Sequence, residues 1–198
     1  GDNLAASLDA LVKASPIARK PAERRAPAVP VSARLAVPDG AVQSTQAAFG
    51  RILFDLAKSD EPLADRIVTT APDVTQTTNL GAFVNQRGLF RRQELADVFQ
   101  KARISSAQKW AATAAGQHIE LGIAEHNFFL LMTALGLAAP HFGTRLLPVG
   151  TVYDPFIARG LDALNYGCYQ DARFLLVGTP SGITLAGEGG AHQSINTP

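Results

Sequence analysis

The fold of this chain is decided by residues 116–137, which read GQHIELGIAEHNFFLLMTALGL. Residues 118–121 predict a short strand, and Gly122 predicts a turn directly after it. Residues 124–137 predict a helix that is apolar on nearly every face, which is typical of a helix buried on both sides. A strand, a glycine turn and a buried helix in this order indicate part of an α/β domain.

Strands and helices alternate on both sides of this stretch. Apolar runs predict further strands over residues 66–70, 146–149 and 173–178, and helices over residues 44–61, 93–102 and 155–166. Residues 73–92 are polar, contain two glycines and predict a long loop at a strand end. The alternation predicts an α/β fold in which helices cover both faces of a parallel sheet and ligands bind at the carboxyl ends of its strands.

The first 43 residues are expected to lie outside this domain. Leucines at helical spacing predict a short amphipathic helix that ends before Pro16, and we expect residues 1–15 to be the tail of a preceding domain. Residues 16–43 are rich in alanine, proline and arginine without apolar periodicity, which predicts an interdomain linker. The domain itself would then occupy residues 44–198.

Composition excludes several classes of function. Eighteen basic and seventeen acidic side chains give a formal net charge of +1, so no strong field would attract nucleic acid or an anionic membrane. The single cysteine, Cys168, excludes an internal disulfide framework and a thiolate zinc site. Residues 128–140, the longest apolar run, are fewer than the roughly 20 needed to span a bilayer. We therefore expect a cytoplasmic protein that binds neither nucleic acid nor membrane.

Glu125 is the first candidate for chemistry, because it lies at the first turn of an otherwise apolar helix. A carboxylate there is costly if it stays ionised and unpaired, so it should be protonated or hold a specific partner. The alternative is an acidic residue that complements the helix dipole. His118 and Glu120, like Glu125 and His126, do not have the spacing of a zinc-binding helix, so no metal site is predicted.

His192, Tyr153 and Phe156 are the other candidates. His192 follows three glycines within residues 187–192, which would let the backbone approach a ligand beside a side chain that titrates near neutrality. Tyr153 and Phe156 follow a predicted strand and could present aromatic faces to a ligand. The alternatives are a glycine-rich surface turn for His192 and core packing for the aromatic pair.

Taken together, these segments resemble the pyrimidine-binding domain of thiamine diphosphate enzymes. Residues 116–127 resemble the stretch of transketolase-type enzymes that ends in the glutamate contacting the cofactor aminopyrimidine. Residues 148–156 resemble the aromatic stretch that stacks on this ring, and residues 187–193 resemble the family's Gly-Glu-(Asp)-Gly-x-x-His-Gln signature. Residues 73–92, and Gly88-Leu89-Phe90-Arg91 in particular, are similar to the homodimeric pyruvate dehydrogenase E1 component.

The resemblance implies a role for each candidate. Glu125 would hydrogen-bond N1′ of the aminopyrimidine, which promotes loss of the proton at thiazolium C2, and Tyr153 and Phe156 would line the ring. His192 would face the substrate, with Glu188 as a weaker candidate in the same cavity. The implied reaction is decarboxylation of a 2-oxo acid such as pyruvate, followed by acyl transfer to a lipoyl group. No role is implied for His118, His126 or His141.

The family binds the diphosphate through Mg²⁺ with a Gly-Asp-Gly motif on a separate domain, and no such motif is found here. The family's pyrimidine domain also continues beyond the histidine signature through a further strand and helix, so we expect this domain to be truncated at its C-terminus. The resemblance implies a diphosphate-binding domain or subunit, a homodimer with the Glu125 helix at its interface, and a lipoyl-bearing acyltransferase as partners. The isolated chain is expected to be inactive.

Two other functions remain open at this point. One is two-carbon transfer of the transketolase or deoxyxylulose phosphate synthase type, for which basic phosphate-binding residues are expected near the site. The other is a non-catalytic remnant of the same fold, which would have no chemical reason to keep Glu125, Tyr153, Phe156 and His192 together.

Overall fold

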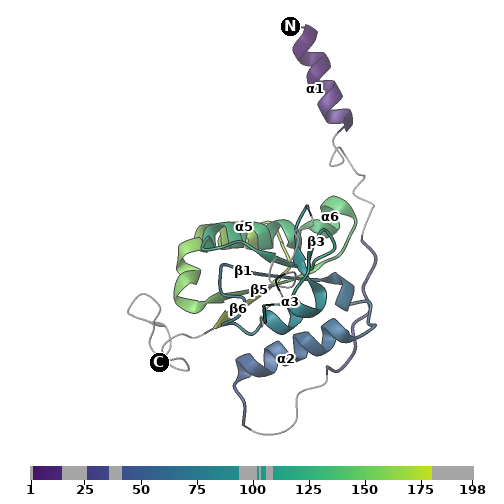
Figure 1. The fold of residues 1–198 in the computed structure, drawn as a ribbon. Coiled ribbons are helices and arrows are strands. Elements are labelled where there is room, and N and C mark those ends of the chain that lie inside the picture. Colours follow the sequence, from purple (N-terminus) through teal and green to yellow (C-terminus); the bar gives the residue numbers. More distant parts are fainter. Residues whose placement is uncertain are drawn as a thin grey trace.

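The computed structural model of the chain describes residues 2–14, 26–35, 42–93, 102, 104–105 and 109–179. Its centre is a six-stranded sheet in which every paired neighbour is parallel and the strand order is β3-β2-β4-β1-β5-β6 (Figure 1). The strands are β1 (Ile67–Ala71), β2 (Leu89–Phe90), β3 (Ala112–Thr113), β4 (His118–Glu120), β5 (Leu147–Tyr153) and β6 (Leu175–Thr179). The predicted parallel α/β architecture is confirmed.

Helices cover both faces of this sheet, as predicted. The α-helices are α1 (Asp2–Ala14), α2 (Thr45–Lys58), α3 (Gly81–Arg87), α5 (Glu125–Gly136), α6 (Ala138–Phe142) and α7 (Leu161–Tyr169), and two 3₁₀ helices are η1 (Ala64–Arg66) and η2 (Asp154–Gly160). Figure 1 shows α2 and α3 on one side of the sheet and α5 on the other. The side chain of Ser44 accepts a hydrogen bond from the Ala47 N–H at 3.1 Å, so Ser44 is the N-cap of α2.

Each face of the sheet has its own apolar core. The first contains Leu53 of α2, Phe83 of α3 and Val149 of β5, together with the buried ends of β1. The second contains Phe128 of α5 and Val152 of β5, and it extends to Tyr153 and Phe156. Because side chains of a strand alternate between the two faces, β5 contributes to both cores.

Three predicted segments differ from the structure. Residues 73–92 contain α3 and β2 where a long loop was predicted. Phe83 and Val84 of α3 are fully buried in the first core, although the residues around them in the sequence are mostly polar. Residues 154–160 form η2, with Pro155 near its start, and the α-helix begins only at Leu161. Helix α5 is not buried on both sides in this chain, since His126, Asn127 and Leu130 are exposed.

The first 43 residues are described only in part. In α1 the leucines of the amphipathic face are exposed, and the helix lies apart from the sheet (Figure 1). Residues 26–35 form neither helix nor strand, but Val29 packs against the first core and Ser32 donates a hydrogen bond to Glu61 at 2.6 Å. The division into tail, linker and domain stays a prediction.

Two further predictions fall largely or wholly outside the described residues. They are the helix over residues 93–102 and the glycine-rich segment that contains Glu188 and His192. Among the helices that the structure describes, none has both the length and the apolarity required to cross a membrane.

Candidate active site

The candidate site lies where β4 and β5 end. The chain leaves β4 through Gly122, whose φ of 68° is in the left-handed region that favours glycine, and enters α5 at Glu125. It leaves β5 at Tyr153 and continues directly into η2. Strands of a parallel sheet end at the same edge, so the two connections meet at the edge where α/β proteins bind ligands.

Glu125 is buried, with 8% of its side chain exposed, and its partner is Arg159 of η2. Arg159 Nη1 donates a hydrogen bond to Glu125 Oε1 at 2.8 Å, while 49% of the arginine side chain stays exposed. A carboxyl group at this position was expected to be either protonated or paired, and in the structure it is paired with Arg159. The N-terminus of α5 adds a favourable dipole interaction.

Tyr153 and Phe156 lie side by side near this pair. Their ring centroids are 6.1 Å apart, and both side chains are mostly buried at the edge of the second core. The guanidinium carbon of Arg159 lies 4.0 Å from the centroid of the Phe156 ring, a cation–π contact. Arg159 therefore connects the buried carboxylate to the aromatic pair.

Tyr153 is also held by the segment that follows β1. Its hydroxyl donates a hydrogen bond to Thr77 Oγ1 at 2.7 Å, and the neighbouring Thr78 hydroxyl lies 2.7 Å from Thr151 Oγ1 of β5. Asp73 and Asn79 bound this segment with φ values of 65° and 62°, a conformation that Asp and Asn tolerate better than most residues. The segment from Asp73 to Asn79 thus lies across the carboxyl end of β5.

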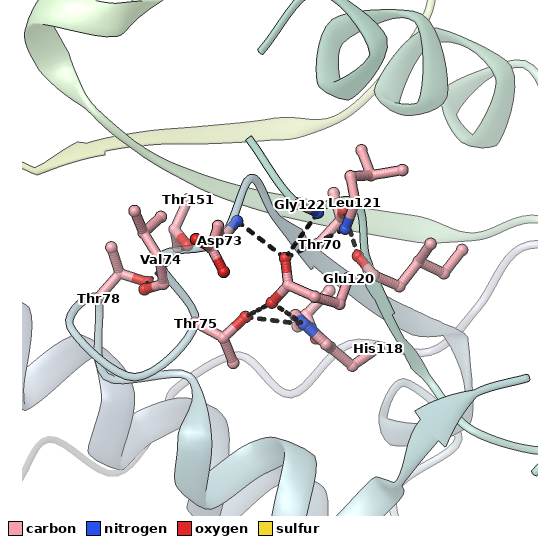
Figure 2. Close-up of polar contacts among 12 residues, drawn as sticks. Thr70, Asp73, Val74, Thr75, Thr78, His118, Glu120, Leu121, Gly122 and Thr151 are labelled. Carbon is pink, nitrogen blue, oxygen red and sulfur yellow. Dashed lines mark hydrogen bonds and ion pairs between the residues drawn. The ribbon is translucent and has the colours of Figure 1, made fainter. Parts of the chain in front are cut away.

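Glu120, the last residue of β4, fixes the other end of this segment (Figure 2). Its Oε1 accepts hydrogen bonds from the N–H groups of Asp73 at 2.8 Å, Leu121 at 3.1 Å and Gly122 at 3.4 Å. Its Oε2 accepts a short hydrogen bond from the Thr75 hydroxyl. One carboxylate therefore connects the end of β4, the glycine turn and the segment after β1.

These contacts decide the charge of Glu120. Burial acts to raise its pKa, but His118, the Thr75 hydroxyl and the Asp73 N–H all favour the ionised form, and together they lower the pKa to about 2. Glu120 is consequently a carboxylate at neutral pH. In this network Glu120 holds the backbone at Asp73, Leu121 and Gly122 in place.

His118 lies behind Glu120 and is fully buried. Its Nε2 is 2.9 Å from Thr75 Oγ1, and its Nδ1 is 2.9 Å from Thr69 Oγ1. The His118 ring therefore lies between two threonine hydroxyls, one of which donates to Glu120. In this network His118 helps to hold the segment after β1 against β4.

A cavity of about 160 Å³ lies elsewhere, at the amino ends of β1 and β5. It is lined by residues 27–30, by Arg66 and by residues 143–145, together with Pro62. None of the predicted site residues lines it. The candidate site is therefore defined by its side chains and by its position at the strand ends.

The structure brings together three of the five predicted site residues, Glu125, Tyr153 and Phe156. Glu188 and His192 lie outside the described residues, so their positions stay predictions. Neither Arg159 nor the network around Glu120 was predicted from the sequence. A signal for the network existed, because Thr69, His118 and Glu120 are polar residues within or at the end of strands that should be buried on both faces.

A doubly covered parallel sheet with a buried carboxylate and two aromatic rings at its carboxyl edge defines a cofactor- or substrate-binding α/β module. A family model described as the pyruvate dehydrogenase E1 component middle domain matches residues 31–197, and the chain belongs to this family. The family is part of the thiamine diphosphate-dependent E1 enzymes. No curated protein matched the chain.

The residues of the site fit the aminopyrimidine of that cofactor. A flat heteroaromatic ring with a basic nitrogen needs a carboxyl group at hydrogen-bonding distance and an apolar surface along its face. Glu125 is a buried carboxyl group already engaged with a planar nitrogen group, and Phe156 and Tyr153 supply aromatic surface beside it.

Proposed function

We propose that this chain is the part of a pyruvate dehydrogenase E1-type enzyme that binds and activates the aminopyrimidine of thiamine diphosphate. The observation that carries the proposal is the burial of the Glu125 carboxylate at the start of α5, beside Phe156 and its neighbour Tyr153. Burial of a carboxyl group is unfavourable for stability alone, so a chemical use of the group explains its position.

Each residue of the site has a defined task in this proposal. Glu125 hydrogen-bonds a ring nitrogen of the pyrimidine and exchanges a proton with it. Phe156 and Tyr153 cover the ring and exclude water, and the hydrogen bond from the Tyr153 hydroxyl to Thr77 keeps the tyrosine in place. His192 faces the substrate and orients its oxygen atoms or moves a proton, and Glu188 belongs to the same cavity.

The overall reaction is decarboxylation of a 2-oxo acid, pyruvate in the first instance, and transfer of the acyl group to a lipoyl group. When bound, thiamine diphosphate supplies the nucleophilic carbon that adds to the carbonyl carbon and the electron sink for loss of carbon dioxide. The residues of this chain prepare the cofactor for that addition.

The proposal also requires partners. A diphosphate-binding domain or subunit holds the diphosphate and Mg²⁺, and the isolated chain is therefore inactive. A second copy of the enzyme completes a homodimer, with the exposed side of α5 around Leu130 at the interface. A lipoyl-bearing acyltransferase receives the product.

We also infer that residues 44–198 form the pyrimidine-binding domain, preceded by a linker over residues 16–43 and a tail over residues 1–15. The free thiol of Cys168, exposed on α7, fits a reducing cytoplasm.

Glu125→Gln in the assembled enzyme tests the proposed function. Loss of proton exchange should lower the rate of pyruvate decarboxylation by about 100-fold or more, since acid–base groups contribute roughly 10² to 10⁴. Glu61→Gln is the control, because Glu61 is partly exposed and lies away from the site beside Ser32. Decarboxylation by the Glu125→Gln enzyme within twofold of the wild-type rate would refute the assignment.

A further inference from the structure

Arg159 makes both of the contacts that the proposed site offers to a pyrimidine. Its Nη1 occupies the hydrogen-bonding position on Glu125 Oε1 at 2.8 Å, and its guanidinium lies 4.0 Å from the centroid of the Phe156 ring. A single planar group thus pairs with the carboxylate and covers the aromatic ring at the same time.

A guanidinium and an aminopyrimidine share the chemistry that these two contacts require. Both are flat and rich in nitrogen, both can present an N–H to a carboxylate, and both stack on aromatic faces. The buried carboxylate and the ring therefore cannot serve Arg159 and a pyrimidine in the same positions. A pyrimidine that takes the position of Arg159 on Glu125 Oε1 and over the Phe156 ring must therefore displace the arginine.

The exposure of the pair indicates which group moves. Glu125 is 8% exposed and begins a helix packed in the second core, whereas Arg159 is 49% exposed on a long flexible side chain. The backbone beside Arg159 packs closely on α5, because a Cβ atom on the adjacent Gly160 would overlap the Phe129 ring. The half-exposed arginine side chain is therefore the part of the pair that can rotate into solvent.

We propose that Arg159 is a placeholder for the cofactor: it pairs with Glu125 and covers Phe156 until the aminopyrimidine of thiamine diphosphate displaces it. The inference rests on the proposed function. Its benefit to the protein is that the buried carboxylate is paired at every stage, first by the arginine and then by the pyrimidine.

The placeholder competes with the cofactor, so its removal should tighten cofactor binding. The pyrimidine must break both the cation–π contact and the partly exposed ion pair of Arg159, and the absence of these two contacts should raise the affinity roughly tenfold. Without Arg159 the carboxylate of Glu125 also loses its partner, so the unliganded enzyme should become less stable. Tighter binding combined with a lower Tm is not expected from a merely structural arginine.

The test is calorimetric titration of the assembled enzyme with thiamine diphosphate in the presence of Mg²⁺, comparing Arg159→Met with wild type. We expect a Kd about tenfold lower for Arg159→Met, and an intermediate Kd for Arg159→Lys, which keeps the charge but loses the planar group. Arg51→Met is the matched control. Arg51 lies on α2 and makes the same two kinds of contact. It forms an ion pair with Asp55 at 3.0 Å, and its guanidinium carbon is 5.8 Å from the centroid of the Phe54 ring.

An unchanged or weaker affinity in a folded Arg159→Met enzyme overturns the placeholder. If that variant does not fold, the wild-type enzyme gives the answer by NMR of its arginine side chains. Cofactor titration should shift the Nε–Hε signal of Arg159 and leave that of Arg51 unchanged. A stationary Arg159 signal in an enzyme that binds the cofactor refutes the placeholder alone, whereas a wild-type enzyme that binds no cofactor refutes the proposed function with it.

Discussion

Glu120 is the residue whose charge contributes most clearly to the stability of the site. Its pKa in the folded chain is about 2, below the ordinary value of 4.5. The folded state therefore binds a proton less readily than the unfolded state between these two values. The stabilising contribution of Glu120 is complete above pH 4.5 and is lost as the pH falls toward 2.

Glu120→Gln should lower the free energy of unfolding at pH 7 by about 1–3 kcal/mol, because an amide replaces a carboxylate that accepts several hydrogen bonds. Urea denaturation of the variant and the wild type at several pH values measures the effect. The difference between the two proteins should shrink as the pH falls from 4.5 toward 2. A difference that stays constant across this range would contradict the account of Glu120, and Glu61→Gln serves as a control with little effect.

Single residues also show what sequence reasoning can predict. Glu125 could be singled out because a carboxylate on a helix that is apolar on nearly every face is costly unless it is protonated or paired. Arg159 could not, because its partner lies 34 positions earlier in the chain and is reached only when η2 and α5 pack together. The sequence around Arg159 does not indicate which carboxylate it contacts.

At the scale of elements, the contact between η2 and α5 positions the candidate site. Gly160 ends η2 and lies against Phe129, one turn after Glu125 in α5. Its φ of −123° is accessible to any residue, so glycine is needed here for space and not for conformation. The close approach is what places Arg159 within reach of Glu125.

Gly160→Ala should therefore cost about 1–3 kcal/mol of stability, the usual range for overpacking a core. Chemical denaturation of the chain measures this loss. Gly178→Ala is the matched control, because the nearest atom to its added Cβ is the flexible end of Ile157 at 3.3 Å. Equal stabilities of the two variants would show that η2 and α5 are not in the close contact described.

The elements themselves were predictable where one signal dominated. The apolar spacing over residues 44–61 predicted α2 within one residue of its observed start at Thr45. Helix α3 was missed because its buried Phe83 and Val84 are surrounded by polar residues and glycines, a composition that favours a loop. The 3₁₀ geometry of η2 was missed because its apolar pattern does not distinguish a 3₁₀ helix from the α-helix that continues it.

At the scale of the whole molecule, alternating strands and helices were sufficient to predict a parallel sheet covered on both faces. They were not sufficient to predict the strand order, in which β1 lies between β4 and β5. That order brings the segment after β1 between the ends of β4 and β5, where Glu120 and Tyr153 hold it. The site is therefore a product of topology as much as of its individual residues.

The most direct test of the central claim is an experimental structure of the assembled enzyme with thiamine diphosphate and Mg²⁺ bound. We predict that a carboxylate oxygen of Glu125 lies within about 2.6–3.2 Å of N1′ of the aminopyrimidine, the distance that proton exchange requires. A pyrimidine bound at another position, with Glu125 still paired to Arg159, would contradict both the proposed function and the placeholder.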